Sequence, residues 1–249
     1  MLALIGGSGL SSLDGFEPIK QNKINTIFGE TSACLNIGKF AKKEIVFLPR
    51  HGNPHVVPPH KINYRANIWA LKDLGVQKII AVTAVGGITA LLSPGTIVIP
   101  HQIIDYTYGR ENTFFDGTIK SLEHIDFTQP YNSDLRTRLI EVARKEKIKI
   151  IDEGVYAATQ GPRLETSAEI LRLENDGADI VGMTGMPEAS LAKEAGLAYA
   201  KISIVANWAA GKNDSEQKIT VNDINSVVQG SIAKIKKIIS SYLNEENGG

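Results

Sequence analysis

Short apolar runs alternate with longer amphipathic stretches along the whole chain. Four β-rich runs, each followed within two residues by Gly, Pro or Asn, predict strands at residues 2–5, 43–48, 78–84 and 199–205. Apolar side chains recur at helical spacing in three other segments, which predicts helices over residues 63–74, 134–147 and 221–242. The strongest local signals therefore describe a chain in which strands and helices take turns.

Weaker signals fill the intervals between these elements. Further short strands are predicted at residues 31–37, 96–99, 103–106, 155–157 and 178–181. The hydroxyl of Thr166 is suited to cap a helix that reaches Asn175, and Pro187 is expected in the first turn of another helix. Residues 109–130, which include His124, show no periodic pattern and predict a long irregular excursion.

The alternation of strands and helices continues without a linker-like change in composition, an internal repeat or a low-complexity tract. Such alternation is typical of a sheet covered by helices on both faces. We therefore expect an α/β fold: a single domain over residues 1–249 whose mixed central β-sheet is flanked by helices.

Charge and cysteine content exclude several classes of protein. The 27 Lys and Arg residues balance 27 Asp and Glu, and no basic tract is present, which argues against a nucleic-acid partner. No apolar run approaches the roughly 20 residues that a membrane span requires, so no membrane partner is expected. The start of the chain, broken by Gly6 and Gly7, does not resemble a signal peptide. With Cys34 as its single cysteine, expected to be buried, a cytoplasmic protein is indicated.

Candidate chemistry gathers at the ends of predicted strands. Three loops of small residues carry the hydroxyl groups of Ser8, Thr83 and Thr184, and a fourth begins with Arg50 and His51. Backbone amides and hydroxyls in such loops can hold an anion, and a guanidinium can add two parallel hydrogen bonds. Because α/β sheets bind ligands at strand ends, these loops predict one local site for a small anion.

Each of these features also has a plainer interpretation. The glycines at 6, 7 and 9 would suit any tight turn, and they lack the Gly-x-Gly-x-x-Gly spacing of a dinucleotide site. The Arg50–His51 pair would suit an ordinary surface. His51, His55 and His60 are separated by prolines that spoil helical ligand spacing, so no metal is expected.

Several segments together closely resemble the methylthioadenosine phosphorylase branch of the trimeric purine nucleoside phosphorylases. They read GGSGL, LPRHG, PPHKINYRAN, AVTAVG, GPR and GMTGMPEA, at residues 6–10, 48–52, 58–67, 81–86, 161–163 and 182–189. The resemblance implies a homotrimer that binds phosphate and a nucleoside and needs no metal or organic cofactor, because phosphate is a co-substrate. It also implies that phosphate is held by Ser8, Arg50, His51, Thr83, Ala84 and Thr184, with Met183 under the ribose.

The reaction that this family implies is phosphorolysis, in which phosphate attacks carbon 1′ of a nucleoside and the purine leaves. The site must hold a dianion beside a developing cation and stabilise negative charge on the departing base. Arg50 and the backbone amides of the loops would serve the first task. Asn207, after the penultimate predicted strand, would serve the second, because an amide both donates and accepts.

The base that leaves can be inferred from hydrogen-bonding groups. Adenosine-type members carry acidic residues after the penultimate strand, where this chain has Asn207 and Ala209. Asn207 can donate to oxygen 6 of hypoxanthine or guanine, and Glu165 can accept from their protonated nitrogen 1. Leu164 is expected beside them in the substrate pocket. The plainer alternatives are that Asn207 is a turn residue at the end of a strand and that Glu165 is a charged residue at the start of a helix.

The 5′ substituent of the sugar is the less constrained part of the substrate. His124 resembles the histidine with which a neighbouring subunit closes the pocket in members that act on methylthio-nucleosides. His124 could instead be a surface residue, and a residue in segment 209–218, which also suits a mobile lid, could bind a 5′-hydroxyl.

The reaction expected first is S-methyl-5′-thioinosine plus phosphate giving hypoxanthine and S-methyl-5-thioribose 1-phosphate. Phosphorolysis of inosine or guanosine is the next alternative. Phosphorolysis of methylthioadenosine is favoured if Glu165 is protonated, because a neutral acid donates to adenine. A purine- or phosphate-binding protein without turnover is the alternative from another class, and a dinucleotide-dependent oxidoreductase has less support.

Overall fold

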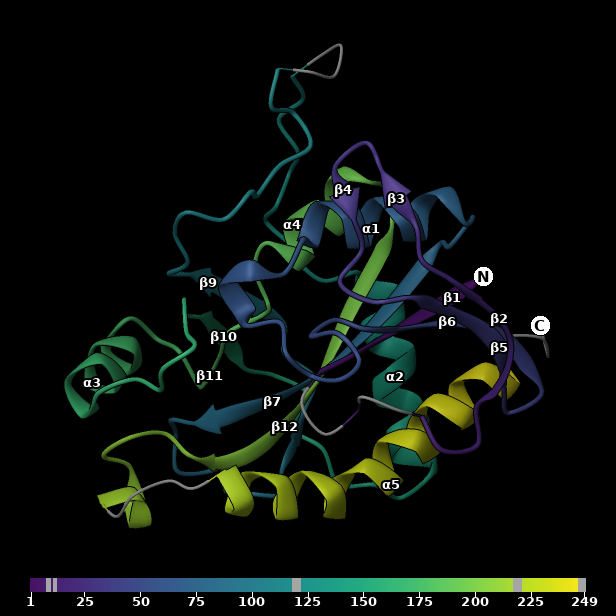
Figure 1. Ribbon diagram of the computed structural model, residues 1–249. Coiled ribbons are helices and arrows are strands. Elements are labelled where there is room, and N and C mark those ends of the chain that lie inside the picture. The colour runs from purple at the N-terminus through teal and green to yellow at the C-terminus, as the bar shows by residue number, and fades with distance from the viewer. Residues whose placement is uncertain (8–9, 11–12, 118–121, 217–220, 246–249) are drawn as a thin grey trace.

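The computed structural model describes residues 1–7, 10, 13–117, 122–216 and 221–245. Among these residues, a ten-stranded mixed sheet forms the centre of the molecule (Figure 1). Its strands are β1 (Leu2–Gly6), β2 (Glu17–Asn22), β5 (Leu35–Phe40), β6 (Lys43–Pro49), β7 (Lys78–Gly87), β8 (Ile97–Val98), β9 (Gln102–Asp105), β10 (Val155–Ala158), β11 (Ile180–Gly182) and β12 (Ala198–Trp208). They run in the order β2-β5-β6-β1-β7-β11-β10-β9, and β12 pairs with β7 and β8. A separate two-stranded sheet joins β3 (Asn25–Thr26) to β4 (Gly29–Glu30).

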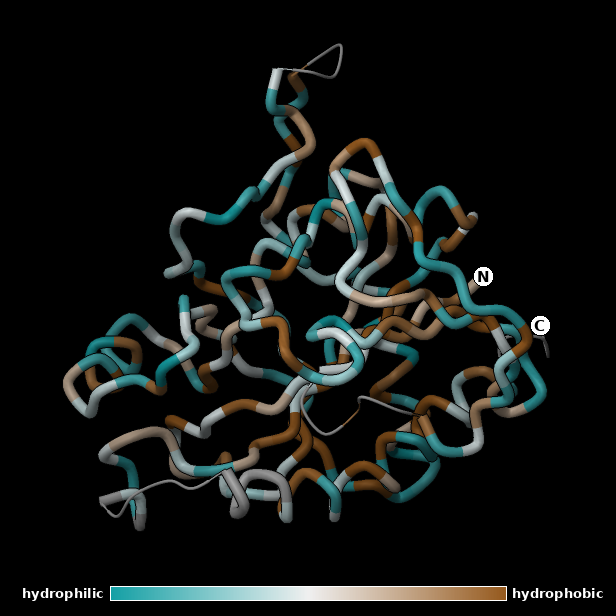
Figure 2. The backbone as a smooth tube through the Cα atoms, viewed as in Figure 1, coloured by the Kyte–Doolittle hydropathy of each residue, from teal (hydrophilic) through white to brown (hydrophobic). Residues whose placement is uncertain are grey.

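Helices cover both faces of the sheet, as expected. On one face α1 (Tyr64–Asp73) and α4 (Glu188–Glu194) pack on Ile79 and Ala81 of β7. On the other face α2 (Ser133–Lys145) and α5 (Val221–Glu245) pack on Ile80 and Val82. This alternation follows the two-residue period of a strand and explains why β7 is apolar on both sides (Figure 2). A third cluster joins α3 (Ser167–Asn175) to the β10 and β11 end of the sheet.

Side-chain caps fix where several helices begin. Asn63 accepts a hydrogen bond from the Ala66 amide at 3.0 Å, and α1 starts after it. Thr166 and Glu169 bond each other's backbone amides in a capping box at the start of α3. Two short 3₁₀ turns, η1 (Pro59–Lys61) and η2 (Asn213–Glu216), complete the elements. The predicted cap at Thr166 is confirmed.

The edge of β7 that faces β1 changes partner along its length. β12 lies parallel to β7 from end to end, so it occupies the opposite edge. The first edge pairs with β1 as far as Ala81, and β11 pairs with it, antiparallel, only at Gly86 and Gly87. Within the described ladders, residues 82–85 therefore have no strand on that edge. Such a change of partner in an open sheet is where ligands are usually bound.

The predicted mixed α/β fold and most of its elements are confirmed, and a few expectations are wrong in detail. The strand expected at 31–37 begins only at Leu35, and Cys34 is half-buried rather than buried. Pro187 is the N-cap of α4 and not part of its first turn. The strands β2, β3 and β4 had no signal in the sequence because their residues are mostly exposed and polar.

Residues 109–130 form the expected excursion, which projects from the top of the molecule in Figure 1. No helix or strand occurs in its described parts, 109–117 and 122–130. Its base is nonetheless attached, because the Phe114 amide donates to Glu194 of α4 at 2.7 Å and Arg65 of α1 donates to Asp116 at 2.7 Å.

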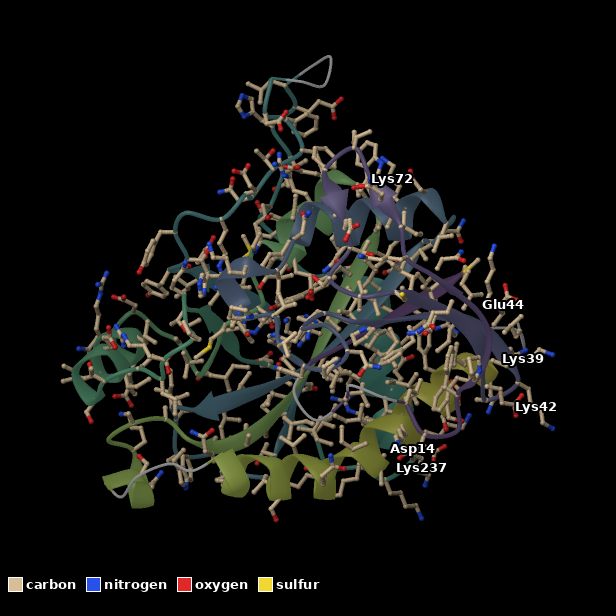
Figure 3. The ribbon with its side chains drawn as sticks, viewed as in Figure 1. Asp14, Lys39, Lys42, Glu44, Lys72 and Lys237 are labelled. Atoms are coloured by element: carbon tan, nitrogen blue, oxygen red, sulfur yellow. The ribbon has the colours of Figure 1, made fainter. Side chains whose placement is uncertain are left out.

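Most charged side chains of the described residues lie on the outside and mix both signs. Figure 3 shows Glu44 beside Lys39 and Lys42 at the β5–β6 edge, and Lys237 on the outer side of α5. Lys237 also lies 2.7 Å from Glu146. None of the helices in the described residues combines the length and the apolar content that a membrane crossing requires.

Candidate active site

A pocket opens where the edge of β7 lacks a strand partner. It collects side chains from the ends of β6, β7, β11 and β12 and from the loop between β10 and α3. The predicted site residues that line it are Arg50, His51, Thr83, Ala84, Leu164, Glu165, Met183, Thr184 and Asn207. Ser8 lies outside the described residues, while its neighbour Gly7 lines the pocket. Residues from seven separate segments of the chain, Gly7 and Pro59 among them, therefore meet in one cavity.

Arg50 is fully buried and is held by an ion pair. Its Nε and Nη2 donate to the two carboxylate oxygens of Glu188 at 2.8 and 2.9 Å, and its Nη1 donates to the Val82 carbonyl at 2.9 Å. Burial alone would raise the pKa of Glu188, but the charge and hydrogen bonds of Arg50 outweigh it, and the pKa is lowered. Glu188 is therefore ionised and fixes the guanidinium plane at the pocket.

This pairing changes the expected contact of Arg50 with an anion. The two parallel bonds that the sequence suggested for phosphate are made to Glu188 instead. A guanidinium has five N–H groups, and three are engaged, which leaves one on each Nη for a ligand. Arg50 remains suited to an anion, but as a pre-oriented donor in a pair whose charges cancel.

His51 is buried, stacks on His55 at a centroid distance of 4.3 Å and lies 2.9 Å through Nδ1 from the Val57 carbonyl. Burial, followed by the positive charge of Arg50, lowers its pKa to about 4. The ring is therefore neutral at neutral pH, and Nδ1 carries the proton that it donates to Val57. Nε2 is left as an acceptor. The sequence suggested that His51 donates a hydrogen bond to phosphate. Because Nδ1 is engaged with Val57, His51 instead offers Nε2 as an acceptor, which suits a protonated phosphate oxygen.

The low pKa of His51 predicts a loss of stability in acid. The unfolded chain binds a proton near the ordinary value of 6.5, whereas the folded protein binds it near 4. Between these values acid favours unfolding, and His51 lowers the free energy of unfolding by about 2 kcal/mol from about pH 7 to pH 5. Urea unfolding at both pH values measures the change. His51→Asn should lose this part of the pH dependence, while His124→Asn, at an exposed position, should keep it. Equal pH dependence in His51→Asn and the parent would contradict the assignment.

Close backbone approach shapes the anion end of the pocket. A Cβ on Gly7 would lie 2.6 Å from Arg50 Nη1 and 2.9 Å from the Val82 carbonyl, so only glycine fits there. Thr83 lies 3.3 Å from Ser203 of β12, hydroxyl to hydroxyl, and the Thr184 amide donates to the Tyr156 hydroxyl at 3.4 Å. The two threonines are thus held from behind.

The other end of the pocket carries groups suited to a purine base. Glu165 accepts a hydrogen bond from the Thr159 hydroxyl at 2.6 Å through Oε1, which leaves Oε2 for a ligand. Asn207 follows a bulge in the pairing of β12 with β7, and its Nδ2 donates to the Trp208 carbonyl at 2.7 Å. A bulge re-aims the side chain that follows it. The amide keeps its Oδ1 and one N–H for a ligand.

Sequence reasoning missed Arg110, which ties the loops of the base end together. Its Nη1 donates to the carbonyls of Met183 and Met186 at 2.8 and 2.7 Å, and its Nη2 donates to those of Thr159 and Gln160 at 3.2 and 2.8 Å. It stands in the irregular excursion, where no pattern marks a buried contact. Sequence reasoning also missed Glu188 as the partner of Arg50, although Glu188 lies in the segment 182–189 that carries the family resemblance.

His124 is exposed and is absent from the residues that line the pocket of its own chain. Its predicted role belongs to a neighbouring subunit and stays a prediction. In the described part of the chain, no group of three or more His, Cys, Asp or Glu residues is placed to hold a metal ion. The pocket thus combines neutral and positive donors with a carboxylate and an amide.

A mixed α/β sheet with a polar pocket where β7 changes partner is the arrangement on which the comparison with known families can be made. The family model described as the phosphorylase superfamily matches residues 2–244, and the chain belongs to this family.

Known relatives and structures agree with this assignment. The chain is 49% identical over 242 residues to a probable S-methyl-5′-thioinosine phosphorylase of Pseudomonas syringae pv. tomato, covering 97% of this chain and 98% of that one. It is 43% identical to the 6-oxopurine nucleoside phosphorylase of Pyrococcus furiosus, covering 96% and 90%. The solved methylthioadenosine phosphorylase of Schistosoma mansoni with adenine matches with a TM-score of 0.94 and 33% identity, covering 100% and 92%.

Proposed function

We propose that this enzyme catalyses the phosphorolysis of 6-oxopurine nucleosides, with S-methyl-5′-thioinosine as its preferred substrate. The observation that carries the proposal is that Glu165 and Asn207 line the same pocket as Arg50, His51 and Thr184. A carboxylate and an amide match the protonated nitrogen 1 and oxygen 6 of hypoxanthine. Relatives named for thioinosine and 6-oxopurine substrates support it.

The two ends of the pocket divide the work of the reaction. Arg50 and the hydroxyls of Thr83 and Thr184 hold phosphate so that one oxygen faces carbon 1′ of the ribose. As that oxygen bonds to carbon 1′, the bond to nitrogen 9 breaks and its electrons move onto the base. Asn207 donates to oxygen 6, which stabilises the negative charge that grows on the leaving base. Nitrogen 7 takes up a proton from water as the hypoxanthine anion leaves, and Oδ1 of Asn207 accepts a hydrogen bond from that N–H. No cofactor enters this scheme.

Several finer points complete the proposal. Leu164 and Pro59, which line the pocket beside the base and phosphate groups, favour a methylthio group over a hydroxyl at carbon 5′. A homotrimer, in which His124 of one subunit completes the pocket of the next, follows from the resemblance of this segment to methylthio-nucleoside members. A single domain over residues 1–249 is supported by the family match, and a cytoplasmic location by the lone Cys34.

Inosine or guanosine as preferred substrate is the second candidate, since a relative from Pyrococcus furiosus is named for 6-oxopurine nucleosides in general. Methylthioadenosine is the third, because it is the substrate named for the Schistosoma mansoni structures. Adenine has an acceptor at nitrogen 1, which would face an acceptor on Glu165. A site built on hydrogen bonds can reject such a mismatch by about 10⁴-fold.

The test follows base release from S-methyl-5′-thioinosine, methylthioadenosine, inosine and guanosine, with and without phosphate. We expect release only with phosphate, and the highest kcat/KM for methylthioinosine. A higher kcat/KM for inosine or guanosine than for methylthioinosine would support the role of Asn207 and Glu165 but contradict the apolar site for the 5′ substituent. The highest kcat/KM for methylthioadenosine would contradict the assignment of a 6-oxopurine as the preferred base. Nucleoside binding by equilibrium dialysis without any phosphate-dependent release would identify a binding protein instead.

A further inference from the structure

Lys201, in the middle of β12, is a buried lysine that the reaction scheme does not use. It is fully buried, and its Nζ has no hydrogen-bond partner among the described residues. An ammonium group buried without a partner is costly, and such groups concentrate at functional sites. The position of Lys201 in the fold indicates what it does.

Lys201 lies directly behind the anion end of the pocket. Its Nζ is 4.9 Å from the centre of the Tyr156 ring. The Tyr156 hydroxyl accepts a hydrogen bond from the Thr184 amide, and a Cβ on Gly182 would lie only 2.2 Å from that hydroxyl. Tyr156 therefore fills the space between Lys201 and the loop that carries Thr184.

A second contact links Lys201 to the ion pair. Its Nζ is 6.0 Å from the centre of the Tyr199 ring, and the Tyr199 hydroxyl donates to Glu188 at 2.7 Å. Glu188 in turn holds Arg50. Lys201 is thus separated from each half of the anion site by a single aromatic ring.

Because the charges of the surrounding groups cancel, the protonation of Lys201 sets the net charge of this buried cluster. Arg50 and Glu188 cancel each other, and His51 is neutral near neutral pH. The neighbouring tyrosines are uncharged, because burial raises the pKa of Tyr131, Tyr156 and Tyr199. When Lys201 carries its proton, this buried cluster has a net positive charge. When Lys201 is neutral, the cluster has none.

We propose that Lys201 is a positioning residue for phosphate, which supplies from one layer below the net positive charge that the Arg50–Glu188 pair lacks. It acts through Tyr156 and the Glu188–Tyr199 contact without touching the ligand. This inference rests on the proposed function, because it treats the pocket as the phosphate site of a phosphorylase. A bound dianion attracts the proton of Lys201, so anion binding and proton uptake are coupled.

The coupling falls in an accessible pH range. Burial lowers the pKa of Lys201 to about 7. The negative charge of Glu188 raises this pKa and offsets part of the effect, while the positive charge of Arg50 lowers it further. As pH rises through this range the proton is lost, and the affinity for a dianion falls. His51 titrates near pH 4 and is silent in this range.

Sulfate is the probe of choice because, unlike phosphate, it stays a dianion throughout this range. Calorimetric titration of the full-length protein between about pH 6 and 8.5 should show sulfate affinity falling about tenfold as pH rises. Lys201→Met should bind sulfate about tenfold more weakly at the lower pH, with little change across the range. Lys234→Met removes an exposed lysine of α5 and should behave like the parent.

Kinetics and stability separate this role from a structural one. Lys201→Met should raise the KM for phosphate about tenfold and leave the KM for the nucleoside unchanged. Its melting temperature near pH 6 should not fall, because an apolar side chain replaces a buried unpaired charge. Sulfate affinity that is independent of pH in the parent protein overturns the proposal without any variant. A Lys201→Met protein that binds sulfate as tightly as the parent near pH 6 also overturns it.

The outcomes distinguish this inference from the proposed function. If the parent protein releases no base from any of the four nucleosides, the proposed reaction is wrong, and the sulfate titration still decides whether Lys201 supports an anion site. If the parent is active and its sulfate affinity does not depend on pH, the reaction stands and the role of Lys201 is wrong.

Discussion

Asn207→Asp is expected to lower kcat/KM for methylthioinosine by about a thousandfold, because the change removes the amide N–H that donates to oxygen 6. The amide Nδ2 of Asn207 donates to the Trp208 carbonyl at 2.7 Å. A carboxylate in its place would face that carbonyl oxygen and turn away from it. It would also place negative charge beside a base whose own negative charge is growing.

The same substitution should favour adenine nucleosides, because a carboxylate accepts from the exocyclic amine of adenine. Relative rates on methylthioinosine and methylthioadenosine measure the change, and the KM for phosphate should stay the same. Asn25→Asp, at an exposed position in β3 that does not line the pocket, adds the same charge and is the control. An unchanged ratio of the two rates would remove Asn207 from base recognition.

Arg50→Met is expected to destabilise the protein by about 3–5 kcal/mol, because it leaves the carboxylate of Glu188 buried without its cation. Glu188 is only 2% exposed, and both of its oxygens bond to Arg50. The double variant Arg50→Met with Glu188→Met replaces the ion pair by apolar side chains. It should recover most of the lost stability.

Activity should not recover with stability. Both variants lack the guanidinium that faces the pocket, so both should lose phosphate-dependent base release. Urea unfolding gives the free energies, and saturation with phosphate gives the loss of function. If the single variant were as stable as the parent, the ion pair would not be buried as described. If the double variant used phosphate normally, Arg50 would have no part in binding it.

Much of the fold was predictable because its central strands are buried on both faces. The strands β1, β6 and β7 each contain a run of at least four consecutive apolar residues, and the helices α1, α2 and α5 carry clear amphipathic spacing. The strand β2 escaped prediction because its side chains are exposed or half-buried, so that no alternation marks it. It exists because its backbone pairs with β5, and a single sequence does not display pairing.

The pocket residues were predictable from loop motifs, but their supporting contacts were not. Arg50 and Glu188 are 138 residues apart, and their meeting depends on the packing of α4 against the sheet. The neutral state of His51 follows from burial and from the Arg50 charge, which are properties of the folded protein. Residue type thus indicated candidate groups for binding an anion, while their protonation states required the structure.

The position of Arg110 has a consequence for inhibitors of this enzyme. One guanidinium holds four carbonyl groups from two loops, and it comes from an excursion outside the pocket. Arg110 is not among the residues that line the cavity, so a compound filling the cavity does not rely on contact with it. The spacing of the cavity walls nevertheless depends on Arg110. Resistance to a tight-binding purine analogue can therefore arise from substitutions in residues 109–117 that leave every drug-contacting side chain unchanged.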